Sequence, residues 1–211
     1  MHRWFLTLAA LALLVVAFAP DGLAERVHVR VEGKTRTIFG STQPAVEVGG
    51  TSVPENPVPP QTALGALEAA GGLGEFYYHV AQTGFGPYVD QIGRYAAGGT
   101  SGWVFKVNGA SPPVGADQVT LRDGDSVLWY WADFSSGAGP MTLRLTRSRG
   151  SCYRAFAEDD SGNRISASSA VLHVGSRRAV QTRGGSACVG RHRGLLVRAT
   201  MPGAVRSNAV R

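Results

Sequence analysis

The chain has 211 residues, 28 of them glycine, with two cysteines and a formal net charge of +6. This length suits two small domains. Neither cysteine has a second Cys or His at ligand spacing, which excludes a cysteine-based metal site. The charge is uneven, because residues 25–133 carry 7 Lys+Arg against 11 Asp+Glu, whereas residues 134–211 carry 13 Arg against 3 acids.

The first 24 residues have the three parts of a secretory signal peptide. Arg3 supplies a positive charge, the segment 5–19 is an apolar run, and small residues at 22–24 offer a cleavage site. The run is too short for a comfortable membrane span, so we expect cleavage after Ala24 and no stable span afterwards. The alternative is an uncleaved N-terminal anchor. Both predict a secreted or cell-surface protein.

The mature chain opens with a predicted hairpin. Apolar and polar residues alternate over 26–32, as in a strand with one wet face, and a turn at Gly33-Lys34 extends this pattern to a hairpin over 26–40. The segment 41–60 is rich in Pro and Gly, and we expect it to be a loop.

One short helix is expected next. Thr62 can serve as its N-cap, Leu64 and Leu67 begin a narrow apolar stripe, and Gly71-Gly72 would end it. A helix of this length cannot bury itself, so its stripe needs a sheet to cover.

Several segments predict the strands of that sheet, namely 77–82, 87–95, 102–108 and 117–131 with a turn at Asp123-Gly124. In the last segment Trp129 and Trp131 share one face, whereas Tyr130 lies on the opposite face. Strands, one helix and further strands predict an α+β domain over residues 25–134, with a short helix on a mixed sheet.

The rest of the chain reads as all-β. Residues 135–140 form a predicted linker, and only strand-like runs and turns follow over 141–211. Outside the cytoplasm, Cys152 and Cys188 predict a disulfide that closes about 37 residues, for roughly 3.8 kcal/mol of stabilisation in the loop-entropy model. The prediction is a small β-sandwich whose disulfide joins its two sheets.

Catalytic motifs are missing from the sequence. It contains no G-x-S-x-G elbow and no phosphate-binding glycine loop, and its histidines are scattered. The closest acidic pairs, Asp123/Asp125 and Asp159-Asp160, lie in turn sequences, where Asp satisfies local backbone donors. We therefore expect no enzyme and no metal site. A cleft holding His79 with a carboxylate within hydrogen-bond reach would instead favour a small-molecule hydrolase.

Residues 26–133 resemble the transcobalamin-like C-terminal domain family, which has a β-grasp-like fold. The resemblance rests on Trp103, Val107-Asn108-Gly109 and the segment from Gly124-Asp125 to Trp129. It implies cobalamin, another corrinoid or another planar small molecule as ligand. The large helical barrel that completes the pocket of the cobalamin carriers has no counterpart here, so an envelope module without a vitamin is the alternative. Residues 141–211 resemble an immunoglobulin-like or transthyretin-like β-sandwich without the core Trp.

The candidate ligand-binding residues are aromatic: Tyr130, Trp131, Tyr88, Trp103 and Trp129. For Trp103 and Trp129, core packing is favoured over binding. At Tyr130 and Trp131 both faces of the strand are aromatic. Either the second domain covers one of them, or a planar ligand stacks there, and the exposure of Trp131 would discriminate.

The basic part of the chain suggests a second kind of partner. An exported basic domain favours an anionic cell-envelope polymer or lipid headgroups over nucleic acid. The candidate contacts are Arg177, Arg178, Arg183, Arg191 and Arg193, and the alternative is a solvated basic surface. We expect an exported, non-enzymatic binding or surface protein; the alternative is a structural cell-envelope interaction or adhesion module without a small-molecule ligand.

Overall fold

The structure, a computed structural model, describes residues 24–49, 58–176 and 178–211. Nearly all of the predicted signal peptide, and Arg177, lie outside the described residues. The described chain forms seventeen β-strands and one α-helix. They are β1 (Glu25–Glu32), β2 (Thr37–Phe39), β3 (Ala45–Val48), α1 (Ala63–Gly74), β4 (Tyr78–Thr83), β5 (Gly86–Ile92), β6 (Tyr95–Ala96), β7 (Ser101–Val107), β8 (Ser126–Asp133), β9 (Met141–Arg147), β10 (Cys152–Glu158), β11 (Arg164–Ser166), β12 (Val171–Val174), β13 (Arg178–Gln181), β14 (Ser186–Cys188), β15 (Val197–Thr200), β16 (Ala204–Val205) and β17 (Ala209–Val210).

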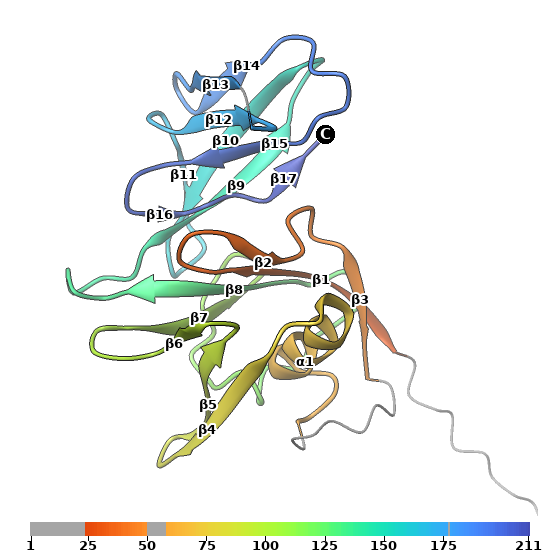
Figure 1. The fold of residues 1–211 in the computed structure, drawn as a ribbon, viewed down its shortest axis with the longest axis vertical. Helices are drawn as coiled ribbons and strands as arrows, with labels where there is room; N and C mark the ends of the chain where they lie inside the picture. The colour runs from red at the N-terminus through yellow and green to blue at the C-terminus, as the bar shows by residue number, and fades with distance from the viewer. Residues whose placement is uncertain (1–23, 50–57, 177) are drawn as a thin grey trace, which may run out of the picture.

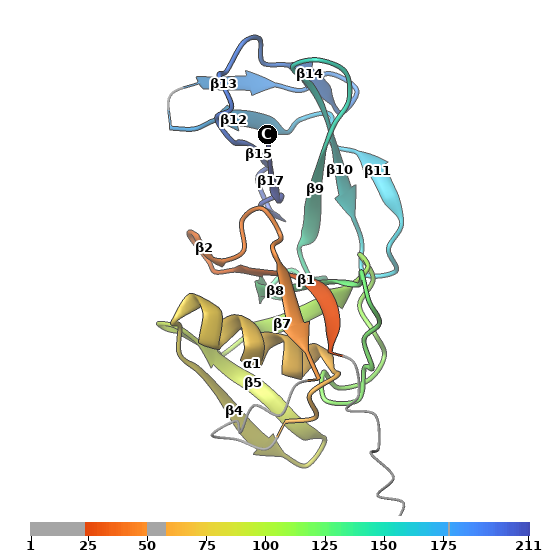
Figure 2. The same cartoon turned by 90° about the vertical axis from the view of Figure 1, so that its right-hand side faces the viewer.

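A five-stranded sheet forms the centre of the N-terminal half, defined here as residues 24–134. Its strands run in the order β2-β1-β8-β7, and β3 also pairs with β1. β1 and β8 are parallel, whereas the other pairs are antiparallel. Helix α1 packs on β1 and β3 (Figures 1 and 2) and buries Leu64, Leu67 and Ala70 there. This sheet, with the helix on one face, positions the aromatic residues.

The predicted fold class, an α+β domain with one β-grasp-like mixed sheet, is wrong. The described chain is mostly β, and the strands of this half fall into two sheets, because β4, β5 and β6 form a separate sheet of three. Strand β3 also forms inside the segment 41–60, which was predicted to be loop. Val46 and Val48 alternate with exposed residues and are buried in the core, so local alternation outweighs the neighbouring Pro and Gly.

The helix begins as predicted and ends later than predicted. The Thr62 hydroxyl accepts a hydrogen bond from the backbone N–H of Gly65 at 3.1 Å, which confirms the N-cap. The helix continues past Gly71 to Gly74, and its C-cap is Glu75 in the left-handed conformation, with φ 49°. Gly71 is buried inside the helix, so this glycine does not stop it.

The C-terminal half, residues 135–211, is an all-β sandwich, as predicted. One sheet has the order β11-β10-β9-β16 with β14 beside β10, and the other has the order β13-β12-β15-β17. The disulfide between Cys152 and Cys188 is confirmed. It links the paired strands β10 and β14 within one sheet, not the two sheets, because the two cysteines are direct cross-strand partners. No helix in the described residues is long and apolar enough to span a membrane.

The two halves meet on the face of the main sheet that lies opposite the helix. Leu128, Tyr130 and Ala132 form a buried cluster there, with Val104 beside them and Val205 packed on them from the C-terminal half. The face of β8 that carries Tyr130 is therefore covered by the second half of the chain. Of the two alternatives for Tyr130, this burial agrees with cover by the second half.

A buried carboxylate anchors one end of this junction. Glu32 is fully buried. Its carboxylate oxygens accept hydrogen bonds from the Thr37 hydroxyl at 2.9 and 3.0 Å. They also form ion pairs with Arg30 at 3.4 Å and with Arg206 at 3.0 Å. Arg198 donates to the Thr37 hydroxyl at 2.6 Å. Burial lowers the pKa of Arg30 to about 10, against the favourable effect of Glu32. Residues from both halves thus share one carboxylate.

A buried lysine anchors the other end. The Lys106 ammonium donates to the backbone oxygens of Glu158 and Asp159 at 3.1 and 2.7 Å and pairs with the Asp160 carboxylate at 3.4 Å. These three residues are the only acids in residues 134–211. The one acidic segment of the basic half therefore lies against the N-terminal half.

Candidate functional site

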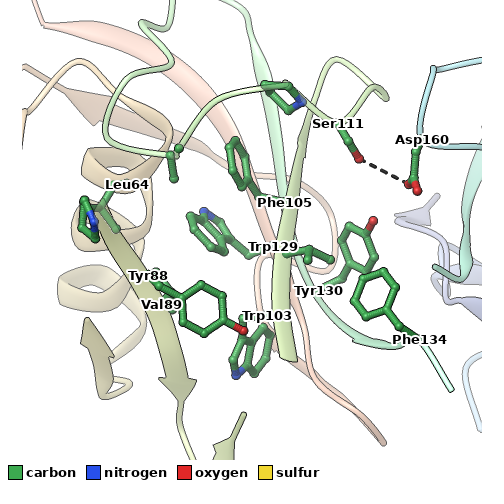
Figure 3. Close-up of a pocket in the computed structure, with 15 residues that line it drawn as sticks. Leu64, Tyr88, Val89, Trp103, Phe105, Ser111, Trp129, Tyr130, Phe134 and Asp160 are labelled. Carbon is green, nitrogen blue, oxygen red and sulfur yellow. Dashed lines mark hydrogen bonds between the residues drawn. The ribbon is translucent and has the colours of Figure 1, made fainter. Parts of the chain in front are cut away.

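An open groove of about 350 Å³ lies along strand β7 and reaches the junction between the halves (Figure 3). Its walls come from the start of α1, from β5, β7 and β8, from the segment 111–116, and from the β10–β11 turn. The lining residues are Leu64, Pro87, Tyr88, Val89, Trp103, Val104, Phe105, Ser111, Pro112, Gly115, Ala116, Trp129, Tyr130, Phe134 and Asp160. Most of these side chains are apolar, and several of them are aromatic rings.

Two fixed indole rings form the inner wall. Trp129 donates from Nε1 to the backbone oxygen of Ala63 at 3.2 Å and stacks on Phe105 with ring centroids 5.1 Å apart. Trp103 donates from Nε1 to the backbone oxygen of Tyr95 at 2.8 Å. Only 1% of Trp103 and 2% of Trp129 is exposed. The packing predicted for these two residues is observed, and their rings also form one side of the groove.

Tyr88 stands at the mouth of the groove with 39% of its surface exposed. It projects from β5 toward β7, and a Cβ atom at Gly102 would overlap its hydroxyl oxygen. A glycine is therefore required at that position of β7 for the tyrosine to lie where it does. Burial raises the pKa of the Tyr88 hydroxyl, so it remains a neutral donor and acceptor at physiological pH.

The far end of the groove is polar. Ser111 donates from its hydroxyl to the Asp160 carboxylate at 3.3 Å, and the Asp160 side chain is 55% exposed (Figure 3). Burial and the nearby Asp160 charge raise the pKa of Tyr130. Phe134 closes this end with 39% of its surface exposed. An exposed carboxylate beside apolar rings suits a ligand that joins a flat apolar group to a cation or hydrogen-bond donor.

The structure brings four of the five predicted site residues together and separates the fifth. Tyr88, Trp103, Trp129 and Tyr130 line the groove, and Trp131 does not. Trp131 is partly buried and meets Trp103 edge-on, with centroids 5.7 Å apart. Because neighbouring strand residues point to opposite faces, Tyr130 and Trp131 cannot stack on one ligand. Whether the other four bind a ligand remains a prediction.

Sequence reasoning missed Phe105, Phe134, Ser111 and Asp160. Phe134 stands in the predicted boundary beside the linker, and Asp160 was assigned to turn chemistry. That assignment is confirmed for its neighbour Asp159, whose carboxylate accepts hydrogen bonds from the backbone N–H groups of Ser161 and Asn163 at 2.9 and 2.8 Å. Only the long-range contact between the β10–β11 turn and Ser111 makes Asp160 part of a site.

His79 and Asp90 meet part of the condition that would favour a hydrolase, namely a cleft that holds His79 within hydrogen-bond reach of a carboxylate. His79 Nδ1 lies 2.7 Å from the Asp90 carboxylate on the β4–β5 hairpin, and the two side chains are 52% and 36% exposed. Neither residue lines the groove. In the described chain, no three His, Cys, Asp or Glu side chains are grouped as metal ligands would be. The pair by itself supplies no nucleophile.

Residues 61–133 match a family described as a domain of unknown function (DUF4430), which covers most of the groove-lining segments. The solved structure of a "putative metal binding protein" from Ruminococcus gnavus ATCC 29149 is similar over 52% of this chain and 97% of that one, with 14% identity and a TM-score of 0.37. A likeness at this score carries no conclusion about this chain. No curated protein matches. The transcobalamin-like resemblance is not confirmed by these matches.

Proposed function

We propose that this protein is a non-enzymatic binding protein, and that the groove along β7 holds the flat, apolar part of its ligand. The observation that carries the proposal is the gathering of six aromatic residues, five on three strands and Phe134 just after β8, around one open groove with a carboxylate at its end. The inner rings are held by hydrogen bonds to backbone oxygens, so the surface is formed before a ligand arrives.

The size of the groove limits the ligand. A volume of about 350 Å³ is at the small end of ligand pockets. It suits one or two fused rings, or one edge of a larger macrocycle such as the corrin ring of cobalamin. Cobalamin, which the sequence resemblance implies, is therefore a ligand to test and not the best fit by size.

A location outside the cytoplasm is part of the proposal. The signal-peptide pattern of residues 1–24 supports it, and the Cys152–Cys188 disulfide is the kind of bond that persists in oxidising compartments. Detection of the mature N-terminus at Glu25 in the exported fraction would test both cleavage and export.

Titration of residues 25–211 with cobalamin and with 2-naphthol tests the groove. Binding is expected to quench tryptophan fluorescence and to shift backbone NMR signals of β5 and β7. Phe134→Ala should weaken binding about tenfold, because the ring is exposed and can be removed without leaving a core cavity. Phe85→Ala is the matched control, since Phe85 is fully exposed and does not line the groove. Equal affinities for both variants, or no saturable binding, would contradict the proposal.

A second candidate function is contact with an anionic envelope polymer through the C-terminal half. The observation that favours it is the confinement of all three acids of residues 134–211 to the junction, which leaves the remaining surface of that half without negative side chains. Retention on dextran sulfate that falls with salt, and falls further in Arg183→Ser or Arg191→Ser, would support it. Unchanged retention in both variants would count against these contacts.

A further inference from the structure

Strand β7 is the last strand of its sheet, so one of its two edges has no strand beside it. Successive backbone groups of a strand point alternately to its two edges. Beyond the two ends of the β7–β8 pair, Asn108 N donates to Ser126 O and Phe134 N donates to Thr100 O, both at 2.8 Å. The even-numbered residues of β7 therefore bond to β8, and the odd-numbered residues face the open edge.

The chain itself closes this edge at both ends. Ser101 exchanges two backbone hydrogen bonds with Gly98, at 2.9 and 3.1 Å. Val107 exchanges two with Ala110, at 2.8 and 3.1 Å, across the Asn108-Gly109 turn. Only the two odd-numbered residues between them can present free backbone groups.

Those two residues are Trp103 and Phe105. Tyr88 lies over the edge at the first, because its hydroxyl oxygen would overlap a Cβ atom at the neighbouring Gly102. The N–H and C=O of Phe105 have no hydrogen-bond partner within the described chain. Backbone groups left unpaired cost free energy unless water or a ligand bonds them. This donor and acceptor, on one residue of a strand edge, are what an added strand would use.

The groove surrounds this edge on both faces of the strand. Trp129 and the ring of Phe105 lie on the helix-facing side, and Tyr130 lies on the other side (Figure 3), where Val104 packs against its cluster. A planar ligand needs only one apolar face. An extended chain needs two, because its successive side chains point to opposite faces. Sheet edges are commonly protected by a charged side chain, but Lys106 is buried in the junction and leaves this edge open.

We propose that an extended peptide adds to the edge of β7 at Phe105, as an extra strand in the groove. This inference rests on the proposed binding function and names the ligand class: the flat apolar group is a side chain of that peptide. Recognition would combine paired backbone bonds to Phe105, an apolar side chain against Trp129, and a basic side chain toward Asp160. A basic peptide also suits the charge of residues 25–133, which hold 7 Lys+Arg against 11 Asp+Glu.

Amide hydrogen exchange of the free protein gives the first test. The Phe105 amide should exchange at least about 100-fold faster than those of Val104 and Lys106, which bond to β8. Equal protection of all three amides would mean that the edge is already occupied, and it would overturn the inference. Small aromatic probes could still bind in that case, so the wider binding function would stand or fall separately.

The second test uses a synthetic library of acetylated, amidated octapeptides in which aromatic or aliphatic residues alternate with lysine. The best binder is then methylated at one backbone nitrogen at a time. Strand addition predicts a loss of about tenfold or more at the one nitrogen whose N–H bonds to the Phe105 carbonyl, and little change at the two nitrogens beside it, because their N–H groups face away from β7. Binding should also slow exchange of the Phe105 amide.

A matched pair of variants places the peptide. Phe134→Ala should weaken the best peptide, and Phe85→Ala should not. No binder in the library, or equal methylation losses at neighbouring nitrogens, would overturn the inference. Binding of 2-naphthol together with failure of every peptide would leave the groove as a small-molecule site, whereas failure of both would remove the proposed function as well.

Discussion

The hydrophobic cores of the two halves differ in amino-acid composition. The N-terminal core contains Trp103 and Trp129, packed under a helix, with aromatic rings around them. The C-terminal core is small by comparison. Its buried set has one large ring, Tyr153, and five alanines among twelve residues. Because alanine buries little area, the second half has less apolar stabilisation per residue and depends more on other links.

Those other links are the disulfide and the junction. Cys152 and Cys188 tie β10 to β14, and residues of the C-terminal half bond to Glu32 and Lys106 of the other half. The junction uses charged groups where the first core uses rings. Buried charges are costly when one partner is lost, so the two regions should respond differently to single substitutions.

Loss of a core ring should have the largest effect. Trp103→Ala should lower the free energy of unfolding by about 4 kcal/mol, because it removes a fully buried indole and its bond to Tyr95. Urea unfolding, followed by circular dichroism, measures this loss. Trp131→Ala is the control, since its ring is only partly buried, and it should cost less than half as much. Equal losses would mean that the first core does not depend on Trp103 in particular.

Loss of the Glu32 carboxylate, which both halves share, should have the second-largest effect on the free energy of unfolding. Glu32→Gln keeps the side-chain volume but leaves Arg30, Arg198 and Arg206 without their counter-charge, and it should cost about 3 kcal/mol. Glu47→Gln, at an exposed position of β3, is the matched control and should change stability little. If Glu32→Gln were as harmless as the control, the junction charges would not hold the halves together.

The strands and cores of both halves were largely predictable, because alternation and turn residues are local signals. The Asn108-Gly109 turn is confirmed with φ 53° and 92°, and so is the Thr62 cap. The partition into sheets was not predictable. Nothing in the sequence of β4 and β5 says that they leave the main sheet, since strand pairing depends on contacts far apart in the chain.

Some of the groove-lining residues could be predicted from local sequence signals, and the others could not because they depend on long-range contacts. Aromatic residues on strands drew attention to Trp103 and Trp129, and alternation placed Tyr130 and Trp131 on opposite faces. The unpaired edge at Phe105 and the contact between Ser111 and Asp160 depend on tertiary structure. A local pattern cannot reveal which strand lies at the edge of a sheet.

Removal of the disulfide tests whether the C-terminal half, which has the smaller hydrophobic core, depends on this bond for its stability. Cys152→Ser should lower the free energy of unfolding of the C-terminal half by about 3 kcal/mol under oxidising conditions. The same variant and the wild type should unfold alike in a reducing buffer, which serves as the control. Near-UV circular dichroism of the tryptophans should stay native below the transition, because all the tryptophans of the described chain lie in the N-terminal half. An unchanged melt in oxidising buffer would contradict a stabilising role of the bond.

The smallest expected change in the free energy of unfolding comes from ionisation of Tyr130, and it appears only at high pH. Burial and Asp160 raise its pKa above the ordinary value of 10.0, so the folded protein keeps the proton while the unfolded chain releases it. The stability it contributes is therefore complete below pH 10 and is lost above it, by about 1.4 kcal/mol for each further pH unit. Tyr130→Phe cannot ionise. Between pH 8 and pH 11 the urea midpoint of the variant should rise relative to that of the wild type. Parallel curves would show that water reaches the hydroxyl, and that the junction side of β8 is less sealed than the helix side.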